Sequence, residues 1–184
     1  MKFAKKIITA VLIIAVAAVA FFYFSKKDQA PIALQDKESS LLDNDRAPAK
    51  DFTFRDLEDK EYSLLDFQGK IIIVNFRTIQ CGACDTEMDF LKTFVPSLDS
   101  DKVKFIPLFL GDKQNAVKTY FRQKNAKFPA YCDDYGLSAI KYRVFALPTS
   151  LIIDKNFKVV VRITGAIDWN QEEVSEFLKA LANE

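Results

Sequence analysis

In the middle of the chain, residues 70–76 (KIIIVNF) form a nearly continuous apolar run. The run is rich in β-branched residues and its polar and apolar positions do not alternate, which is typical of a strand buried on both faces. We therefore predict that this strand lies near the centre of a sheet that helices cover. Residues 103–110 predict a second strand of the same domain.

Shorter segments predict the rest of the sheet. Residues 52–54 and 62–64 flank a charged stretch, and this arrangement indicates a short N-terminal hairpin. Residues 151–153 and 158–163 indicate two further strands that a turn separates.

Three segments show the patterns of helices. The first follows residue 80 and continues to about residue 98, with an expected kink at Pro96. Asp112 is expected to cap the second helix and Asn170 the last one. The last helix carries apolar residues at the i, i+3, i+4, i+7 spacing of one packed face. Strands that alternate with helices, followed by a strand pair and a closing helix, predict an α/β domain.

The N-terminal region has a different character. Residues 7–24 are largely apolar, and as a helix they would span roughly 27 Å, close to the thickness of the hydrocarbon core of a bilayer. Lysines flank this run on both sides, so residues 1–27 predict an uncleaved membrane anchor with the rest of the chain outside the cytoplasm. A cleavable signal sequence is the alternative, because residues 18–20 (AVA) resemble a cleavage site. Residues 28–47 are polar and predict a flexible linker to a folded domain at residues 48–184.

Composition narrows the possible chemistry. The net charge is only +1, from 26 basic and 25 acidic residues, and does not indicate a nucleic-acid partner. The sequence contains no histidine, which excludes Ser-His-Asp and Cys-His catalysis and any metal site that uses histidine. Three cysteines are too few for a scaffold held by disulfides, and a structural zinc site would lack its second cysteine pair.

Cys81 and Cys84 directly follow the predicted central strand, and this placement indicates redox chemistry. The first cysteine would lie at the N-terminus of a helix, where unpaired N–H groups and the helix dipole favour an anion. A thiol whose pKa falls from about 8.5 to about 7 becomes roughly half thiolate at neutral pH. Cys81 is therefore the predicted nucleophile, and Cys84, one turn later, is expected to attack the mixed disulfide and release the partner.

The motifs together resemble the thioredoxin superfamily, and more narrowly the membrane-anchored TlpA/ResA/CcmG-type thiol–disulfide oxidoreductases. The residues that carry the resemblance are Val74-Asn75-Phe76, Cys81-Gly82-Ala83-Cys84, Glu87 and Leu147-Pro148-Thr149. The resemblance covers about residues 48–184 and implies a thioredoxin-like fold with a central mixed β-sheet flanked by helices. It implies no cofactor beyond the redox-active disulfide of Cys81 and Cys84, and no metal.

The resemblance also implies roles for further residues. Leu147, Pro148 and Thr149 match a loop with a cis-proline that faces the disulfide and binds the partner's chain. Glu87 matches an acidic residue near the thiols, and its helical spacing independently places it one turn from Cys84, where a carboxyl can exchange a proton with that thiol. The alternative for Glu87 is an ordinary solvated position on the helix.

Some residues depart from the family pattern or remain outside it. Asn75 replaces the buried aspartate of thioredoxin proper and cannot accept a proton. Arg77 and Gln80 replace aromatic residues common before the first cysteine; Arg77 would add positive potential near Cys81, and Asp85 would oppose it. Cys132 is expected to be an inert, partly buried thiol, with a regulatory thiol as the alternative.

Three functions remain open. The first is an envelope reductase for client proteins with paired cysteines, which the resemblance suggests to be apocytochrome c or the proteins of copper-site and oxidase assembly. The second is a disulfide oxidant or isomerase. The third is a non-enzymatic Cu(I)-binding chaperone that uses both thiolates. A thiol peroxidase is set aside because position 74 is valine, where its motif requires proline.

The first function carries further expectations. Its electrons would come from a membrane thiol-transfer donor, because an oxidising compartment supplies none. The protein would be a monomer in the bacterial inner membrane, with a single pass and the catalytic domain on the periplasmic or extracytoplasmic side.

Overall fold

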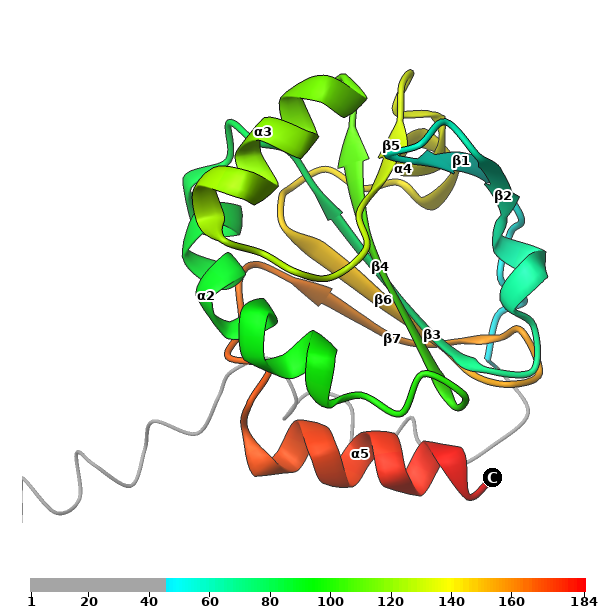
Figure 1. Ribbon diagram of the computed structural model, residues 1–184. Helices are drawn as coiled ribbons and strands as arrows, with labels where there is room; N and C mark the ends of the chain where they lie inside the picture. The colour runs from blue at the N-terminus through cyan, green and yellow to red at the C-terminus, as the bar shows by residue number, and fades with distance from the viewer. Residues whose placement is uncertain (1–45) are drawn as a thin grey trace, which may run out of the picture. The chain divides into compact units, whose positions relative to one another are not determined.

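Residues 46–184 are the part of the chain that the computed structural model describes, and they build a seven-stranded sheet with helices on both faces (Figure 1). Along the chain the elements are β1 (Thr53–Asp56), β2 (Glu61–Ser63), the 3-10 helix η2 (Leu64–Phe67), β3 (Ile71–Arg77), α2 (Gly82–Ser97), β4 (Val103–Leu110), α3 (Gln114–Lys124), β5 (Tyr131–Asp133), α4 (Leu137–Tyr142), β6 (Thr149–Ile153), β7 (Val159–Thr164) and α5 (Glu172–Ala182).

The sheet is mixed, as predicted. Its strand order is β2-β1-β5-β4-β3-β6-β7, with β3 parallel to β4 and antiparallel to β6. All residues of β3 are buried, which confirms that the apolar run at residues 70–76 forms a strand covered on both faces. β1 and β2 form the predicted N-terminal hairpin, and β4 has the predicted bounds.

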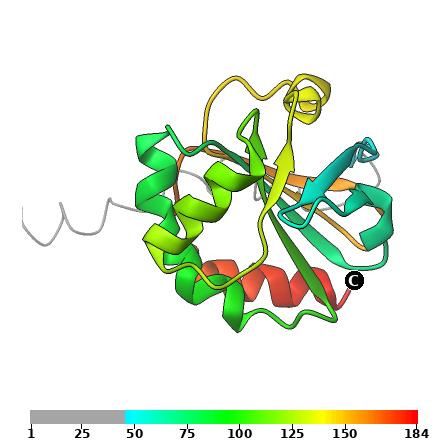
Figure 2. The ribbon, with the colours of Figure 1, turned by 45° about the horizontal axis from the view of Figure 1, so that its top comes forward.

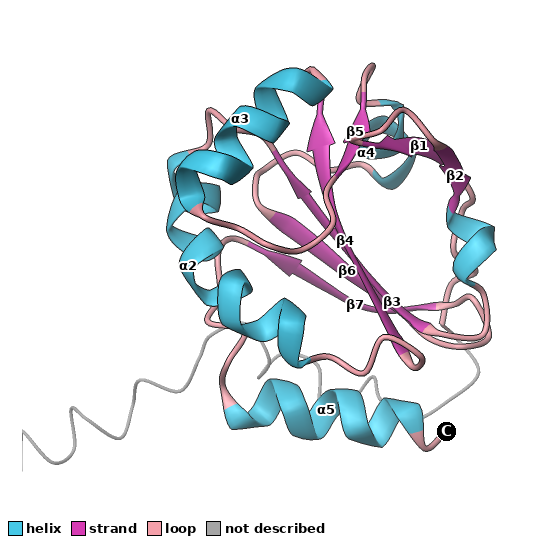
Figure 3. Cartoon of the chain, in the orientation of Figure 1, coloured by secondary structure: helices cyan, strands magenta, loops and turns pink. Residues whose placement is uncertain are grey.

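The two faces of β3 face different sets of elements, because successive side chains of a strand point to opposite sides. Ile71 and Ile73 belong to an apolar cluster that includes residues of α2, α3 and α5. Ile72 and Val74 belong to a second cluster, formed with the hairpin, η2 and α4. Figure 3 shows α2 and α3 to the left of the central strands, α5 below these strands, and the β1–β2 hairpin to their right. The domain therefore has the thioredoxin-like layers that the resemblance implied.

Two predicted helix caps are wrong, and in both cases the side chain bonds elsewhere. The helix expected after Asp112 begins one residue later, with Lys113 at the cap, and the Asp112 carboxylate accepts the N–H of Ile79 at 2.9 Å. The cap of α5 is Gln171. The Asn170 side chain bonds to α2, where it donates to the Phe90 carbonyl at 3.1 Å.

The predicted membrane anchor at residues 1–27 lies outside the described residues, as does most of the predicted linker. Within residues 46–184, no helix combines the length and apolar character needed to cross a bilayer. The described domain starts with Arg46, which forms ion pairs with Asp154 at 3.1 Å and with Glu184 at 2.6 Å. The Ala47 carbonyl accepts the N–H of Val159 at 2.9 Å, so the chain is bound to the domain from its first described residues.

Candidate active site

Cys81 and Cys84 form a disulfide at the start of α2, with a distance of 5.2 Å between their Cα atoms. Cys81 occupies the N-cap position, and its sulfur accepts the backbone N–H of Cys84 at 3.1 Å. Cys81 is half-buried, whereas Cys84 is fully buried. A partner disulfide therefore has access to Cys81 first, and the free N–H groups of the helix start favour a thiolate at that sulfur.

The loop before β6 reaches the same end of the sheet. The Leu147–Pro148 peptide bond is cis, and Thr149 pairs with Phe76, next to the last residue of β3. Figures 1 and 2 show this loop running from α4 back to the end of the sheet at which α2 begins. The structure thus places the predicted partner-binding residues at the sheet end that carries the cysteines.

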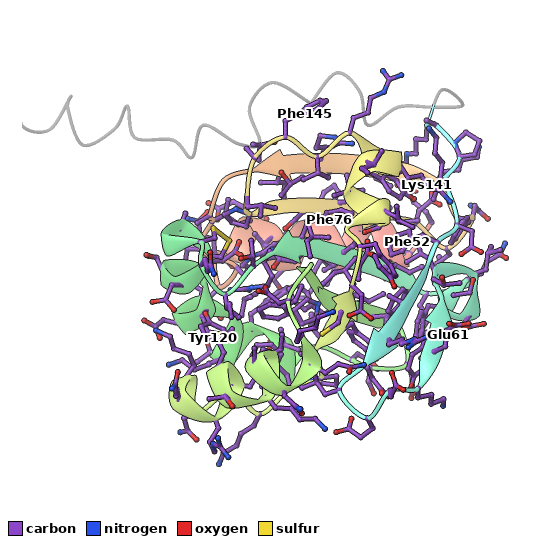
Figure 4. The ribbon with its side chains drawn as sticks, turned by 90° about the horizontal axis from the view of Figure 1, so that it is seen from above. Phe52, Glu61, Phe76, Tyr120, Lys141 and Phe145 are labelled. Carbon is purple, nitrogen blue, oxygen red and sulfur yellow. A yellow bond between two sulfur atoms is a disulfide. The ribbon has the colours of Figure 1, made fainter. Side chains whose placement is uncertain are left out.

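Figure 4 shows the disulfide as a yellow bond next to α2, on the other side of the domain from Glu61 of the hairpin. Phe145, in the loop before the cis-proline, projects outward and is 91% exposed. An exposed phenylalanine on this loop offers apolar surface that a partner chain can cover.

Glu87 is fully buried, so the alternative of a solvated helix position is wrong. Its Oε2 accepts the Asn75 amide N–H at 3.0 Å, and its Oε1 accepts the indole N–H of Trp169 at 2.8 Å. Burial raises the pKa of Glu87, while the bonds from Trp169 and Asn75 and the charge of Arg77 oppose the rise. A buried carboxyl one helical turn from Cys84 is a candidate to exchange a proton with that thiol.

Arg77 is the second buried charge of the site. Its Nη1 donates to the Asn75 side-chain oxygen at 3.2 Å and lies 3.8 Å from Glu87 Oε2, and its Nη2 donates to the Cys84 carbonyl. Its guanidinium carbon lies 5.5 Å from the ring centroid of Phe109. Burial lowers the pKa of Arg77, and the charge of Glu87 opposes this. Arg77 is therefore a buried, paired cation that bonds to the backbone of Cys84.

Asp85 does not oppose Arg77 as a lone charge. Lys124 lies 2.6 Å from one of its carboxylate oxygens, and the Tyr120 hydroxyl donates to it at 3.0 Å. The hydrogen bond from Lys124 is the main cause of a lowered pKa for Asp85. The negative charge of Asp85 is thus paired at the surface of α2 and α3.

Sequence reasoning missed the role of Trp169 and Ser150. Trp169 is 1% exposed and binds Glu87, and the Ser150 hydroxyl accepts an Asn75 N–H at 2.9 Å. One signal for this network is present in the sequence, because Asn75 interrupts an otherwise apolar central strand. A polar residue in such a strand requires hydrogen-bond partners.

Cys132 lies in β5 and is 2% exposed, so the thiol that was expected to be partly buried is buried. Burial raises the pKa of its thiol to about 12. A thiol is neutral below its pKa, so Cys132 carries no charge from neutral pH to about pH 9. Because the thiolate is the reactive form, the neutral thiol should be unreactive.

We expect iodoacetamide to leave Cys132 unlabelled in the native protein and to label it after unfolding in guanidinium, as mass spectrometry would show. Labelling of the native protein at a rate near that of a free thiol would contradict this.

The proteins that this chain resembles include thiol-disulfide oxidoreductases, in agreement with a disulfide at the candidate site. Residues 45–162 match the model of the AhpC/TSA family. The chain is 33% identical to the thiol-disulfide oxidoreductase ResA of Bacillus cereus, over 93% of this chain and 92% of the relative. It is 26% identical to ResA of Bacillus subtilis, over 71% of this chain and 72% of the relative.

Solved structures share the fold. StoA from Bacillus subtilis has a TM-score of 0.59 at 20% identity, covering 75% of this chain and 99% of that one. A thiol:disulfide interchange protein from Chlorobium tepidum has a TM-score of 0.62 at 21% identity, covering 77% and 99%. Fold and disulfide define a thioredoxin-like thiol–disulfide oxidoreductase. The chain belongs to the AhpC/TSA family of thioredoxin-fold proteins, and its relatives include ResA thiol-disulfide oxidoreductases.

Proposed function

We propose that the protein reduces disulfides in client proteins outside the cytoplasm, using Cys81 as nucleophile and Cys84 as resolving thiol. The observation that carries the proposal is the asymmetric pair at the start of α2. Cys81 is the more exposed residue and its sulfur accepts an N–H bond, whereas Cys84 is fully buried, three residues before the buried Glu87. The exchange requires no cofactor beyond the two thiols.

The reaction begins with the reduced dithiol. The Cys81 thiolate attacks one sulfur of the client disulfide, and the other client sulfur leaves as a thiolate that takes a proton from solvent. Cys84 loses its proton to Glu87, and its thiolate attacks Cys81, which forms the Cys81–Cys84 disulfide and releases the second client thiol. Two electrons pass from the enzyme to the client. A membrane thiol-transfer protein would return them, because the compartment is oxidising.

The client's chain would lie along Leu147, Pro148 and Thr149, where the cis-proline loop meets the sheet end that carries the cysteines. Phe145 adds an exposed apolar contact on the same loop. From the family resemblance, we propose apocytochrome c and the proteins of copper-site and oxidase assembly as clients. The same resemblance supports a domain held outside the cytoplasm by the N-terminal apolar segment. We propose that it acts as a monomer, because a small thioredoxin-like domain needs no partner subunit to complete its core.

The reduction potential of the purified protein tests the direction of transfer. We expect a value near or below about −250 mV after equilibration in dithiothreitol buffers, as a reductase needs a stable disulfide form. Cys81→Ser, which has no couple, is the matched control. A value of about −120 to −180 mV would identify an oxidant or isomerase instead. If no reversible couple forms, a Cu(I)-binding role for the two thiols takes its place, and Cu(I) titration would show it.

A further inference from the structure

Arg77 is a cation in a place where charged side chains are rare. It is the last residue of β3 and is fully buried, as is Glu87. A buried ion pair adds little to stability, because the loss of hydration offsets the attraction. The Nε of Arg77 has no hydrogen-bond partner among the described residues, which adds to that cost. Stability alone therefore gives little reason for this pair, and its position suggests a chemical reason.

The contacts of Arg77 connect the acid to the resolving cysteine. One nitrogen, Nη2, donates to the carbonyl of Cys84, and the other, Nη1, lies 3.8 Å from Glu87 Oε2. The Asn75 side chain bridges Arg77 and Glu87, since it accepts a hydrogen bond from Arg77 at 3.2 Å and donates one to Glu87 at 3.0 Å. The guanidinium is thus fixed relative to Glu87 and to the backbone of Cys84.

Glu87 can accept a proton from Cys84 only while it is a carboxylate. Exclusion from water favours the protonated acid, whereas a cation within about 4–6 Å lowers a carboxyl pKa by about 1–3 units. We propose that Arg77 is a positioning residue that keeps Glu87 ionised, so that Glu87 can take the proton of Cys84 in the resolving step. This inference rests on the proposed function and adds to it a residue that acts through Glu87.

The step balances in atoms and electrons. The proton of the Cys84 thiol moves to a Glu87 carboxylate oxygen, and the Cys84 thiolate forms a bond to the sulfur of Cys81. The bond between Cys81 and the client sulfur breaks, and the client leaves as a thiolate with both electrons of that bond. Glu87 then returns its proton to solvent. Throughout, Arg77 stays protonated, and it stabilises the Glu87 carboxylate before the transfer and again after the proton has gone to solvent.

Few other groups reach this pair. From α3 and the first turn of α2, Tyr120 and Asp85 approach Arg77, and Asp85 is itself paired with Lys124. Apart from Arg77, the partners of Glu87 are neutral: Asn75 of β3, and Trp169 and the Ile167 backbone of the segment before α5. Ser150 of β6 bonds to Asn75 and not to Glu87. The pH response of the resolving step should therefore report Glu87 and its counter-ion.

An aromatic disulfide such as 5,5′-dithiobis(2-nitrobenzoic acid) separates the two steps. Attack by Cys81 releases one coloured thiol, and attack by Cys84 on the mixed disulfide releases the second. In Arg77→Met we expect the second phase to slow about tenfold at pH 7 and its rise with pH to move up by about one unit or more, because Glu87 becomes protonated. Lys102→Met is the matched control, because it removes an exposed cation paired with Asp99, and both phases should stay unchanged.

Further variants separate the charge from a packing role. Arg77→Lys keeps the charge and should restore most of the pH profile. In Glu87→Gln, the rate of the second phase should lack the increase with pH that ionisation of Glu87 causes. Adding Arg77→Met to Glu87→Gln should change the rate of the second phase less than twofold. The proposal is overturned if Arg77→Met slows the second phase without moving its pH profile, or slows it equally in the Glu87→Gln background.

The folding of the variants is also decisive. If Arg77→Met fails to fold but Arg77→Met/Glu87→Gln folds, Arg77 compensates the charge of Glu87, as proposed. If neither folds, its role is packing and the proposal fails. Measuring the Cys81–Cys84 couple of the wild-type protein distinguishes failure of this proposal from failure of the proposed function. Absence of a reversible Cys81–Cys84 couple in the wild type defeats the proposed function, whereas a normal wild-type couple with unchanged variant profiles defeats only the role of Arg77.

Discussion

Replacing Cys84 with serine should stop turnover, by about 10³-fold or more, and trap the client on Cys81 as a stable mixed disulfide. Cys81 is accessible and remains able to attack, but the buried thiol that releases the client is gone. Non-reducing electrophoresis after mixing with a disulfide-containing peptide would show the adduct, and dithiothreitol would reduce its disulfide and release the peptide. With the aromatic disulfide, one coloured thiol should appear instead of two.

Two serine variants serve as controls for this trap. Cys81→Ser should form no adduct, because Cys84 is fully buried and cannot meet a client directly. Cys132→Ser should behave as the wild type, since that thiol lies in β5 with 2% exposure. An adduct of equal yield on Cys84 in the Cys81→Ser variant would reverse the proposed order of attack.

Replacing Trp169 with alanine should produce the largest loss of stability, about 3–5 kcal/mol. The indole is 1% exposed and packs against Phe94 and Phe105, with ring centroids 5.2 and 5.7 Å away. Its removal opens a cavity between α2, β4 and the segment before α5, and it takes away the N–H that binds Glu87. Urea unfolding at pH 7, with the midpoint and slope fitted together, would measure the loss.

Trp169→Phe separates packing from the hydrogen bond. The ring largely remains, but Glu87 Oε1 loses its donor, so we expect a loss of about 1–3 kcal/mol at pH 7. Burial already raises the pKa of Glu87, and loss of the donor raises it further. A raised folded-state pKa costs stability as pH rises above the unfolded value, so the loss should shrink on acidification towards pH 5. An equal loss at both pH values would mean that Glu87 is not ionised in the folded protein.

The layers of the domain could be predicted because they follow from local patterns. The apolar run before the cysteines is β3, and residues 103–110 are β4, because burial on both faces leaves no polar positions in a strand. Cys81 at the helix start follows from the same logic, since the cysteine pair begins where the strand pattern ends. These features need only neighbouring residues.

The supports of the site could not be predicted, because they join residues far apart in sequence. Trp169 binds Glu87 across 82 positions, and Asn75 binds Ser150 across 75. The two wrong caps have the same cause, since tertiary contacts took the side chains of Asp112 and Asn170 away from their own helices. A polar residue signals that a partner exists, but only the fold determines which one.

Arg46 lies near the start of β3, at the end of this strand that is far from the disulfide. It binds Asp154, which follows Ile153, and Ile153 pairs with Ile72 at the start of β3. The disulfide follows the other end of β3, roughly 20 Å away along the strand. Arg46 and the disulfide therefore lie toward opposite ends of β3.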